Sequence, residues 1–402
     1  MRAANGLASS GAVKACPSCL TPDMRLFYRV EGAPVHSVLL MNGWKAAVDF
    51  PRGDIALGFC RACGFISNTA FDPSSHNYSG EYEETQSFSG TFRDFHEKLA
   101  SRLIDRYGIR NKTVIEVGCG KGEFLALLCR MGGNRGIGID PAFVPARNPA
   151  ADCDAEFITE FYSEKFADRK ADAIVCKMTL EHIQDTFAFV SLIRRSIGDK
   201  RDTMVFFQVP DAERILSEKA FWDIYYEHCS YFTAGSLSGL FIRAGFEPVE
   251  VTSEYGGQYL TIAARPADDQ ESASESALPA DVEELERSVD QFSICSAHSI
   301  DTWRQRIARL ATKGKRIAIW GSGSKGVAFL TAVRANSDID CVVDINPYRQ
   351  GKYMAGTGHR IISPAQLAKG KPDVVIAMNS IYRDEIRRSL DEHGVAAELL
   401  SL

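Results

Sequence analysis

TVIEVGCGKGEFLALL, residues 113–128, reads as a short apolar strand, a glycine-rich turn and the start of an apolar helix. Glycines in such a turn let the backbone reverse sharply and approach a ligand closely. The next apolar segment, GIGID, ends at Asp140. An acid at the end of a second strand can accept both ribose hydroxyls of a nucleoside. The stretch therefore predicts a parallel, doubly wound α/β sheet with a nucleoside ligand at the carboxyl ends of its strands.

Two ligand classes fit this turn, dinucleotides and S-adenosylmethionine. Dinucleotide sites usually have the spacing GxGxxG, which brings the pyrophosphate to the helix N-terminus. Here the spacing is GxGxG, and Glu116 stands before it. An acid at that place suits a ligand with an amino group and a sulfonium, so S-adenosylmethionine is favoured over a dinucleotide or a purely structural turn. The candidate cofactor residues are Glu116, Gly118, Gly120, Gly122 and Asp140.

The whole chain divides into four regions. Residues 1–75 hold two CxxC pairs, and residues 76–265 hold a helix that ends at Gly108, followed by alternating strands and helices. Residues 266–283 are polar and acidic, which is typical of a linker. Residues 284–402 begin with a helix and continue as a second strand, glycine loop and helix. We expect a small N-terminal domain, a central doubly wound sheet and a smaller, Rossmann-like α/β domain.

The second glycine loop, IAIWGSGSKGVAF, matches GxGxxG through Gly321, Gly323 and Gly326. Asp344 ends the next apolar strand, so this motif by itself fits a nicotinamide cofactor. The stretch from Lys315 to residue 402 has fewer than 90 residues, about half of a full dinucleotide-binding sheet. A nucleotide diphosphate can use the same turn and helix N-terminus, with Lys325 adding a positive charge.

Four of the eleven cysteines stand in two close pairs, CPSC with Cys16 and Cys19, and CRAC with Cys60 and Cys63. Two residues between cysteines let both thiolates reach one ion, and two such pairs supply the four ligands of tetrahedral zinc. Reduced structural thiols and a redox role are the alternatives. Because cysteine fills all four positions, a zinc ion here is expected to be structural and not catalytic. The N-terminal domain is therefore predicted to bind zinc.

Composition limits the classes of partner. The 402 residues carry a net charge of -6, and 45% of them are hydrophobic, which is typical of a globular protein of two or three domains. The acidic balance argues against nucleic acid or an anionic membrane as partner. No apolar run reaches the roughly 18 residues of a spanning helix, and the N-terminus lacks the apolar core of a signal peptide. We therefore expect a cytoplasmic protein.

Residues 225–232 read YYEHCSYF, in which Glu227 and His228 stand among four aromatic residues. One interpretation is a partly buried histidine paired with Glu227 inside an aromatic cluster. The other is catalytic, because the segment follows the strand FFQVP at the carboxyl edge of the predicted sheet, where open α/β sheets bind ligands. Histidine has a reference pKa near neutrality and therefore suits a general base.

The order of these motifs resembles that of the sugar C-methyltransferase family, whose best-known members methylate carbon 3 of a thymidine-diphosphate 4-keto deoxysugar. Four motifs carry the resemblance over nearly the whole chain: the CxxC pairs, the first glycine loop with TLEHIQD (179–185), YYEHCSYF, and the second glycine loop leading to VVDINPYRQGKYMAGTG. The resemblance implies structural zinc, S-adenosylmethionine, and a general base at His228 with Tyr225 and Glu227 near the sugar. The candidate substrate residues are Ser87, Ser89, His96, Gly321, Gly323, Lys325, Gly326, Asn346, Tyr348 and Gln350.

Methylation of carbon needs a carbanion equivalent, which forms when a base removes a proton next to a ketone. In this hypothesis His228 removes the proton, Glu227 orients the imidazole, and Tyr225 donates a hydrogen bond to the enolate oxygen. The alternatives are a methyltransferase for oxygen, nitrogen or a non-sugar metabolite, an NAD-dependent oxidoreductase, and a zinc-dependent adaptor. We expect a monomer or homodimer that acts on a nucleotide-linked keto sugar, without nucleic-acid or membrane partners.

Overall fold

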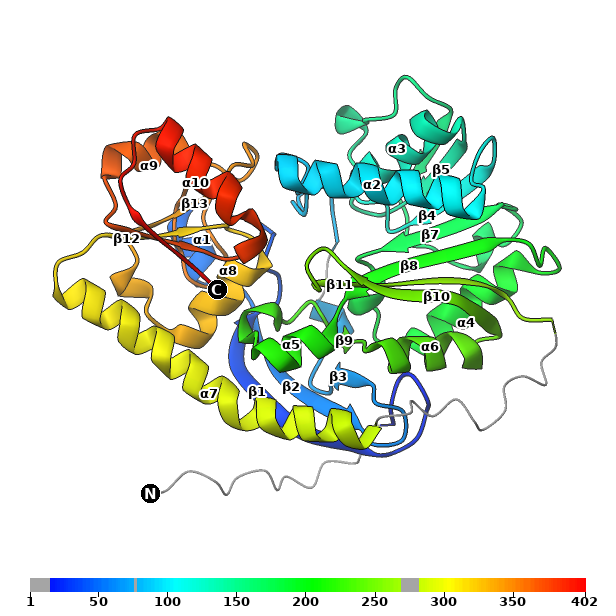
Figure 1. Cartoon of the computed structure of the whole chain (residues 1–402), viewed down its shortest axis with the longest axis horizontal. Coiled ribbons are helices and arrows are strands. Elements are labelled where there is room, and N and C mark those ends of the chain that lie inside the picture. Colours follow the sequence, from blue (N-terminus) through cyan, green and yellow to red (C-terminus); the bar gives the residue numbers. More distant parts are fainter. Residues whose placement is uncertain (1–14, 76–77, 269–281) are drawn as a thin grey trace.

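The computed structural model describes residues 15–75, 78–268 and 282–402 (Figure 1). The residues considered for a signal peptide, up to residue 14, and most of the predicted linker 266–283 lie outside the described residues. The described chain folds into three sheets with helices packed on them. None of its helices is long and apolar enough to cross a membrane.

The central sheet has the order β10-β11-β8-β7-β4-β5-β6. Its strands run parallel from β8 to β6, and β11 and β10 add an antiparallel edge. The predicted doubly wound α/β fold is therefore confirmed. The strands are β4 (Thr113–Val117), β5 (Arg135–Ile139), β6 (Ala155–Ile158), β7 (Ala173–Lys177), β8 (Met204–Pro210), β10 (Phe246–Glu254) and β11 (Tyr259–Pro266).

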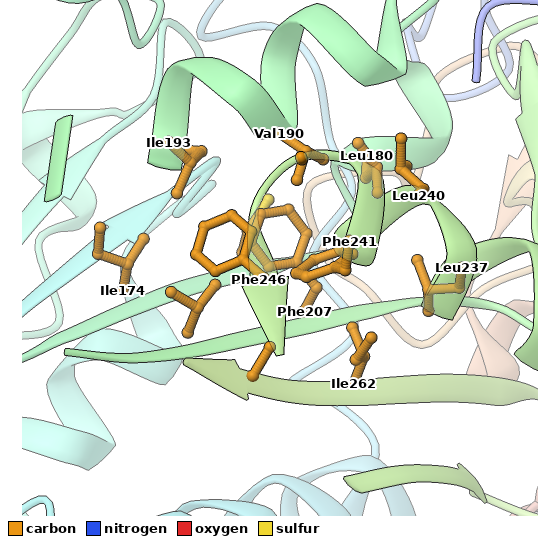
Figure 2. Packing of buried hydrophobic residues seen from close by; sticks show 14 of the residues in the cluster. Ile174, Leu180, Val190, Ile193, Phe207, Leu237, Leu240, Phe241, Phe246 and Ile262 are labelled. Atoms are coloured by element: carbon orange, nitrogen blue, oxygen red, sulfur yellow. The ribbon is translucent and has the colours of Figure 1, made fainter. Parts of the chain in front are cut away.

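Helices cover both faces of this sheet because successive residues of its strands point to opposite sides. Val114 and Val175 pack with α2 (Gly90–Tyr107) and α3 (Glu123–Gly132) on one face. Figure 2 shows the other face, where Ile174 and Phe207 pack against α4 (Thr186–Ile197) and α6 (Ala234–Arg243). The predicted end of the first helix at Gly108 is confirmed, because this glycine caps α2 with a φ of 67°.

A smaller antiparallel sheet holds the N-terminal residues. It contains β1 (Met24–Pro34), β2 (Arg52–Cys60), β3 (Ile66–Asn68) and β9 (Ser230–Tyr231), with α1 (Trp44–Val48) between β1 and β2. Its last strand comes from the YYEHCSYF segment, so the predicted N-terminal and central regions share one sheet. This pairing ties YYEHCSYF to residues that lie more than 150 positions earlier in the chain.

The C-terminal sheet is fully parallel, with the order β14-β13-β12-β15-β16. The long helix α7 (Val282–Thr312) reaches from the N-terminal sheet to this sheet (Figure 1). The C-terminal elements are β12 (Ile317–Trp320), α8 (Ser324–Val333), β13 (Cys341–Val343), β14 (Ile361–Ile362), α9 (Pro364–Gly370), β15 (Val374–Ala377), α10 (Arg383–Glu392) and β16 (Glu398–Ser401). The helix α5 (Ala212–Glu218) and the short helices η1 (Pro73–Ser75), η2 (Pro145–Arg147), η3 (Glu164–Phe166), η4 (Leu180–His182), η5 (Phe221–Asp223), η7 (Asn336–Asp338) and η8 (Ser380–Tyr382) complete the described elements.

The carboxylate of Glu227 joins the N-terminal residues to the central sheet. It is buried and accepts hydrogen bonds from the backbone N–H of Ser37 at 2.5 Å, from the Ser37 hydroxyl, and from the Tyr82 hydroxyl at 2.6 Å. The Nδ1 atom of His36 lies 3.5 Å from it. Burial opposes ionisation of this carboxyl, but the hydrogen bond and charge of His36 outweigh burial and hold its pKa well below its usual range.

A glutamine at position 227 is expected to destabilise the fold in a pH-dependent way. Because the folded-state pKa of Glu227 is depressed, its stabilisation is present above the unfolded pKa of about 4.3 and is lost as the pH falls. Glu227→Gln should lower the free energy of unfolding at pH 7 by about 3 kcal/mol, since buried donors lose a charged acceptor. The difference from the wild type should shrink below about pH 4.

Thermal unfolding followed by circular dichroism from pH 3 to pH 8 measures this difference. The control is Glu247→Gln, which changes an exposed acid and should alter stability by less than about 0.5 kcal/mol. A loss that is equally large at pH 3.5 and pH 7 would show that the charge of Glu227 does not stabilise the fold.

Candidate active site

A cavity of about 750 Å³ lies between the central sheet, the segment 78–92 and the C-terminal sheet. The first glycine loop lines it from one side, and the second glycine loop lines it from another. Tyr225 and His228 of YYEHCSYF face the same space. The structure therefore brings three of the predicted motifs together in one cavity.

The first glycine loop is held in place by Asp140. One carboxylate oxygen of Asp140 accepts the N–H of Gly120 at 2.8 Å, and the other accepts the N–H of Ala142 at 2.6 Å. Gly118 has a φ of 71°, and a Cβ atom there would lie 2.0 Å from the Thr179 hydroxyl. Burial raises the pKa of Asp140. Asp140 lines the cavity and each of its oxygens can accept a second hydrogen bond, which suits the predicted role of accepting ribose hydroxyls.

Glu116 and Gly122 differ in their relation to the cavity. Glu116 is buried, lines the cavity, and within the described chain its Oε2 atom has no hydrogen-bond partner. Burial raises its pKa to about 7, although the nearby Lys177 opposes that shift. Gly122 instead caps the start of α3 with a φ of 83°, and its missing side chain leaves room for Phe157. The structure therefore does not place Gly122 on the cavity wall, unlike Gly118 and Gly120.

His96 lies beside a lysine that the sequence analysis did not select. Its Nε2 atom is 3.1 Å from Nζ of Lys177, and both side chains are buried and line the cavity. The ammonium of Lys177 also lies 3.9 Å from the centre of the Phe124 ring. Burial, and then the charge of Lys177, lower the pKa of His96 to about 2. His96 is therefore neutral and accepts a hydrogen bond from Lys177.

His228 contacts side chains other than that of Glu227, its expected partner. Its ring packs on Tyr225, with ring centres 4.0 Å apart, and against His182 at 4.8 Å. The Nε2 atom of His228 lies 3.9 Å from a carboxylate oxygen of Glu181, a fully buried residue of η4. The interpretation that pairs Glu227 with His228 is corrected, because adjacent residues of a turn direct their side chains differently and Glu227 bonds to Ser37 and Tyr82.

The second glycine loop is anchored by Asp344. Its carboxylate accepts the Ser322 hydroxyl, the N–H of Ser322 at 3.0 Å and the N–H of Asn346 at 2.9 Å. Gly321, Gly323, Lys325 and Gly326 all line the cavity. The ammonium of Lys325 is engaged by Asp223 in a salt bridge.

The other predicted substrate residues divide into two groups. Ser89 and Asn346 line the cavity, although Ser89 donates to Glu385 at 2.7 Å and Asn346 donates to Glu83 at 2.8 Å. The three residues that do not line it are Ser87, which donates to Glu123, Tyr348, which is 51% exposed, and Gln350, which donates to the Asp344 carbonyl at 3.0 Å.

The four predicted metal ligands converge. Sγ of Cys16 is 3.7 Å from Sγ of Cys63, Sγ of Cys19 is 3.6 Å from Sγ of Cys60, and all four sulfur atoms lie within 4.8 Å of one another. Tetrahedral zinc with Zn–S bonds of about 2.3 Å requires sulfur atoms about 3.8 Å apart. Hydrogen bonds from the other three cysteines, and then burial, raise the pKa of Cys63. The donor set and spacing therefore fit a zinc ion.

Sequence reasoning missed two charged residues of the cavity, Lys177 and Glu181. Lys177 ends β7 and Glu181 lies just after it in η4, at the carboxyl edge of the sheet, so the same edge rule that selected YYEHCSYF could have found them. His182, which stands in the segment TLEHIQD, was likewise not assigned to the site; it lines the cavity, and its Nδ1 atom lies 2.8 Å from the Tyr78 hydroxyl.

Comparisons with known proteins agree with this arrangement. Residues 91–251 match the family model for a methyltransferase domain, and residues 254–397 match that for the C-methyltransferase C-terminal domain. The C-methyltransferase NovU of Streptomyces niveus is 29% identical over 325 residues, which cover 76% of each chain.

The similar solved structures share low sequence identity and low TM-scores with this chain. One is the 1,6-didemethyltoxoflavin-N1-methyltransferase of Burkholderia thailandensis with bound S-adenosylhomocysteine, at 18% identity and a TM-score of 0.36, covering 51% of this chain and 96% of that one. Another is a protein of Pyrococcus horikoshii OT3, at 15% identity and a TM-score of 0.37, covering 47% of this chain and all of that one. On the two family models and the curated relative, the chain belongs to the S-adenosylmethionine-dependent C-methyltransferases.

Proposed function

We propose that the enzyme methylates a carbon next to a ketone in a nucleotide-linked deoxysugar, with His228 as the base. The observation that carries this proposal is that Tyr225 and His228 line the same cavity as the two glycine loops. One cavity thus combines the methyl-donor loop, a second loop suited to a nucleotide, and an imidazole beside a phenol. This combination supports carbon as the methyl acceptor, because enolisation needs a base and a donor to the developing oxyanion.

The proposed chemistry assigns one step to each side chain. S-adenosylmethionine, when bound, supplies the electrophilic methyl group. His228 takes the proton from the carbon next to the ketone, and the electron pair of the broken C–H bond passes into the enolate. Tyr225 donates a hydrogen bond to the enolate oxygen. When the carbon gains the methyl group the ketone reforms, and the proton on His228 exchanges with water.

In this proposal Glu181, and not Glu227, is the acid that assists the His228 imidazole. Burial raises the pKa of Glu181 to about 8, and within the described chain its oxygens have no hydrogen-bond partner. The Nε2 atom of His228 lies 3.9 Å from a carboxylate oxygen of Glu181, so protonation of His228 favours the ionised form of Glu181. Glu181 is therefore proposed to stabilise the imidazolium, while Glu227 fixes the loop that carries His228.

The second glycine loop is proposed to hold the nucleotide part of the acceptor. Gly323 and Ser324 at the start of α8 line the cavity, and a helix N-terminus favours phosphate groups. A nicotinamide dinucleotide is less well supported, because the carboxylate of Asp344 accepts the Ser322 hydroxyl and pairs with Arg349 at 3.3 Å in addition to accepting two N–H groups. The proposed substrate is accordingly a nucleotide-linked keto sugar.

The four-cysteine cluster is proposed to bind one structural zinc ion. Its residues lie between the N-terminal sheet and the central domain, where the N–H of Phe187 donates to the Pro17 carbonyl at 3.3 Å and Arg243 donates to the Ser18 hydroxyl at 2.9 Å. Four thiolates leave no open coordination position, so this ion takes no part in the reaction.

Replacing His228 by alanine should abolish enolisation. With a thymidine-diphosphate 4-keto deoxysugar in heavy water, His228→Ala should slow deuterium wash-in at the carbon next to the ketone by about 10² to 10⁴-fold. Methyl transfer, followed by mass spectrometry, should fall in parallel. Glu181→Gln should reduce both rates less, because the base itself remains.

The matched control for this experiment is His393→Ala, which removes an exposed histidine of the C-terminal region. It should leave exchange and methyl transfer unchanged. Normal exchange in a folded His228→Ala variant would mean that another group is the base.

Purified wild-type protein should contain about one zinc ion per chain by atomic emission spectrometry. Cys63→Ser should lose most of it and unfold at a lower temperature, because three thiolates bind zinc more weakly than four. Cys295→Ser, which changes a cysteine of α7 outside the cluster, should keep the zinc. Metal-free protein with Cys16–Cys63 or Cys19–Cys60 disulfides would favour the redox alternative.

A further inference from the structure

Glu116 and Lys177 are buried, oppositely charged residues that face one cavity without pairing with each other. Glu116 Oε2 has no hydrogen-bond partner in the described residues, and Nζ of Lys177 lies 3.1 Å from the His96 ring nitrogen. In the described parts of the chain neither forms a salt bridge. Isolated buried charges are strongly disfavoured unless a partner of opposite charge is supplied. The missing partners of both groups point to a ligand that carries both charges.

The topology places the two charges side by side on one face of the sheet. Glu116 of β4 is in register with Val175 of the parallel strand β7, and Lys177 follows Val175 by two residues. Residues two apart in a strand point to the same face, so both side chains project toward α2 and α3. His96 of α2 and Phe124 of α3 hold the ammonium there, at 3.1 Å and 3.9 Å.

The ammonium of Lys177 keeps donors for a ligand. It has three N–H groups, and the neutral His96 ring accepts one of them. Burial lowers the pKa of Lys177 to about 8, and the negative charge of Glu116 opposes that shift. The two charged groups therefore interact electrostatically, although no salt bridge joins them in the described residues.

We propose that Lys177 binds the α-carboxylate of S-adenosylmethionine, next to Glu116, the acid before the first glycine loop whose position suits the α-ammonium group. The pair then recognises the zwitterionic amino-acid end of the methyl donor, and Asp140 remains for the ribose at the other end of the same loop. Lys177 is a cofactor-binding residue in this assignment, and His96 positions it. The inference depends on the cofactor of the family and is independent of which acceptor the enzyme methylates.

The test compares three adenosine ligands by isothermal titration calorimetry. S-adenosylhomocysteine carries both charges, its decarboxylated analogue carries only the ammonium, and 5′-methylthioadenosine carries neither. In the wild type the decarboxylated analogue should bind at least about tenfold more weakly than S-adenosylhomocysteine. This measurement needs no variant and so does not depend on a mutant that folds.

Variants then assign each charge to its residue. Lys177→Met should weaken S-adenosylhomocysteine by about tenfold or more and leave the other two ligands unchanged. Glu116→Gln should weaken S-adenosylhomocysteine and its decarboxylated analogue but not 5′-methylthioadenosine. The matched control is Lys170→Met, an exposed lysine before β7 at the opposite edge of the sheet, which should bind all three as the wild type does.

Two outcomes would overturn the proposal. One is a folded Lys177→Met variant that binds S-adenosylhomocysteine normally but has a raised KM for the acceptor, which would assign Lys177 to the acceptor site. The other is an equal loss for all three ligands, which would mean that Lys177 only shapes the pocket. Failure of His228→Ala to stop enolisation affects neither result, so the two proposals are tested separately.

Discussion

The buried carboxylate of Glu227 is the constraint on which the active site depends. A carboxylate without access to water needs donors, and those donors come from Ser37 and Tyr82, which lie far from it in the sequence. The N-terminal segment must therefore be in place before the loop that carries His228 is fixed. This requirement explains why the N-terminal region shares a sheet with the YYEHCSYF segment: both contacts hold the same loop against the cavity.

The segment that follows Tyr82 extends this constraint to the C-terminal sheet. Glu83 forms a salt bridge with Arg147 and accepts a hydrogen bond from Asn346, and its carbonyl accepts one from Arg349 at 2.6 Å. A few residues later Ser89 caps α2 and donates to Glu385 of α10. A single connection thus fixes the wall of the cavity on both sides. A site enclosed in this way strengthens electrostatic interactions with a bound ligand.

The sequence was informative where a motif is local. The strand, glycine turn and helix at 113–128 and the acid at Asp140 need only the standard geometry of a parallel sheet, so the fold and this strand–turn–helix unit were predicted correctly. Two residues between cysteines likewise constrain both sulfur atoms, and the predicted convergence of Cys16, Cys19, Cys60 and Cys63 was found. Gly122 fits the glycine pattern but does not line the cavity, because the absence of a side chain at this position makes room for Phe157.

Contacts between distant residues could not be derived in the same way. Adjacency of Glu227 and His228 suggested a pair, yet the partner of each lies tens of residues away or more, since direction of the side chain and not sequence distance determines contact. Lys177 and Glu181 are ordinary residues in the sequence and become informative only as buried charges near a cavity. Topology predicts the edge where ligands bind, and the charges that the protein leaves unpaired at that edge indicate which chemical groups the ligand must bring.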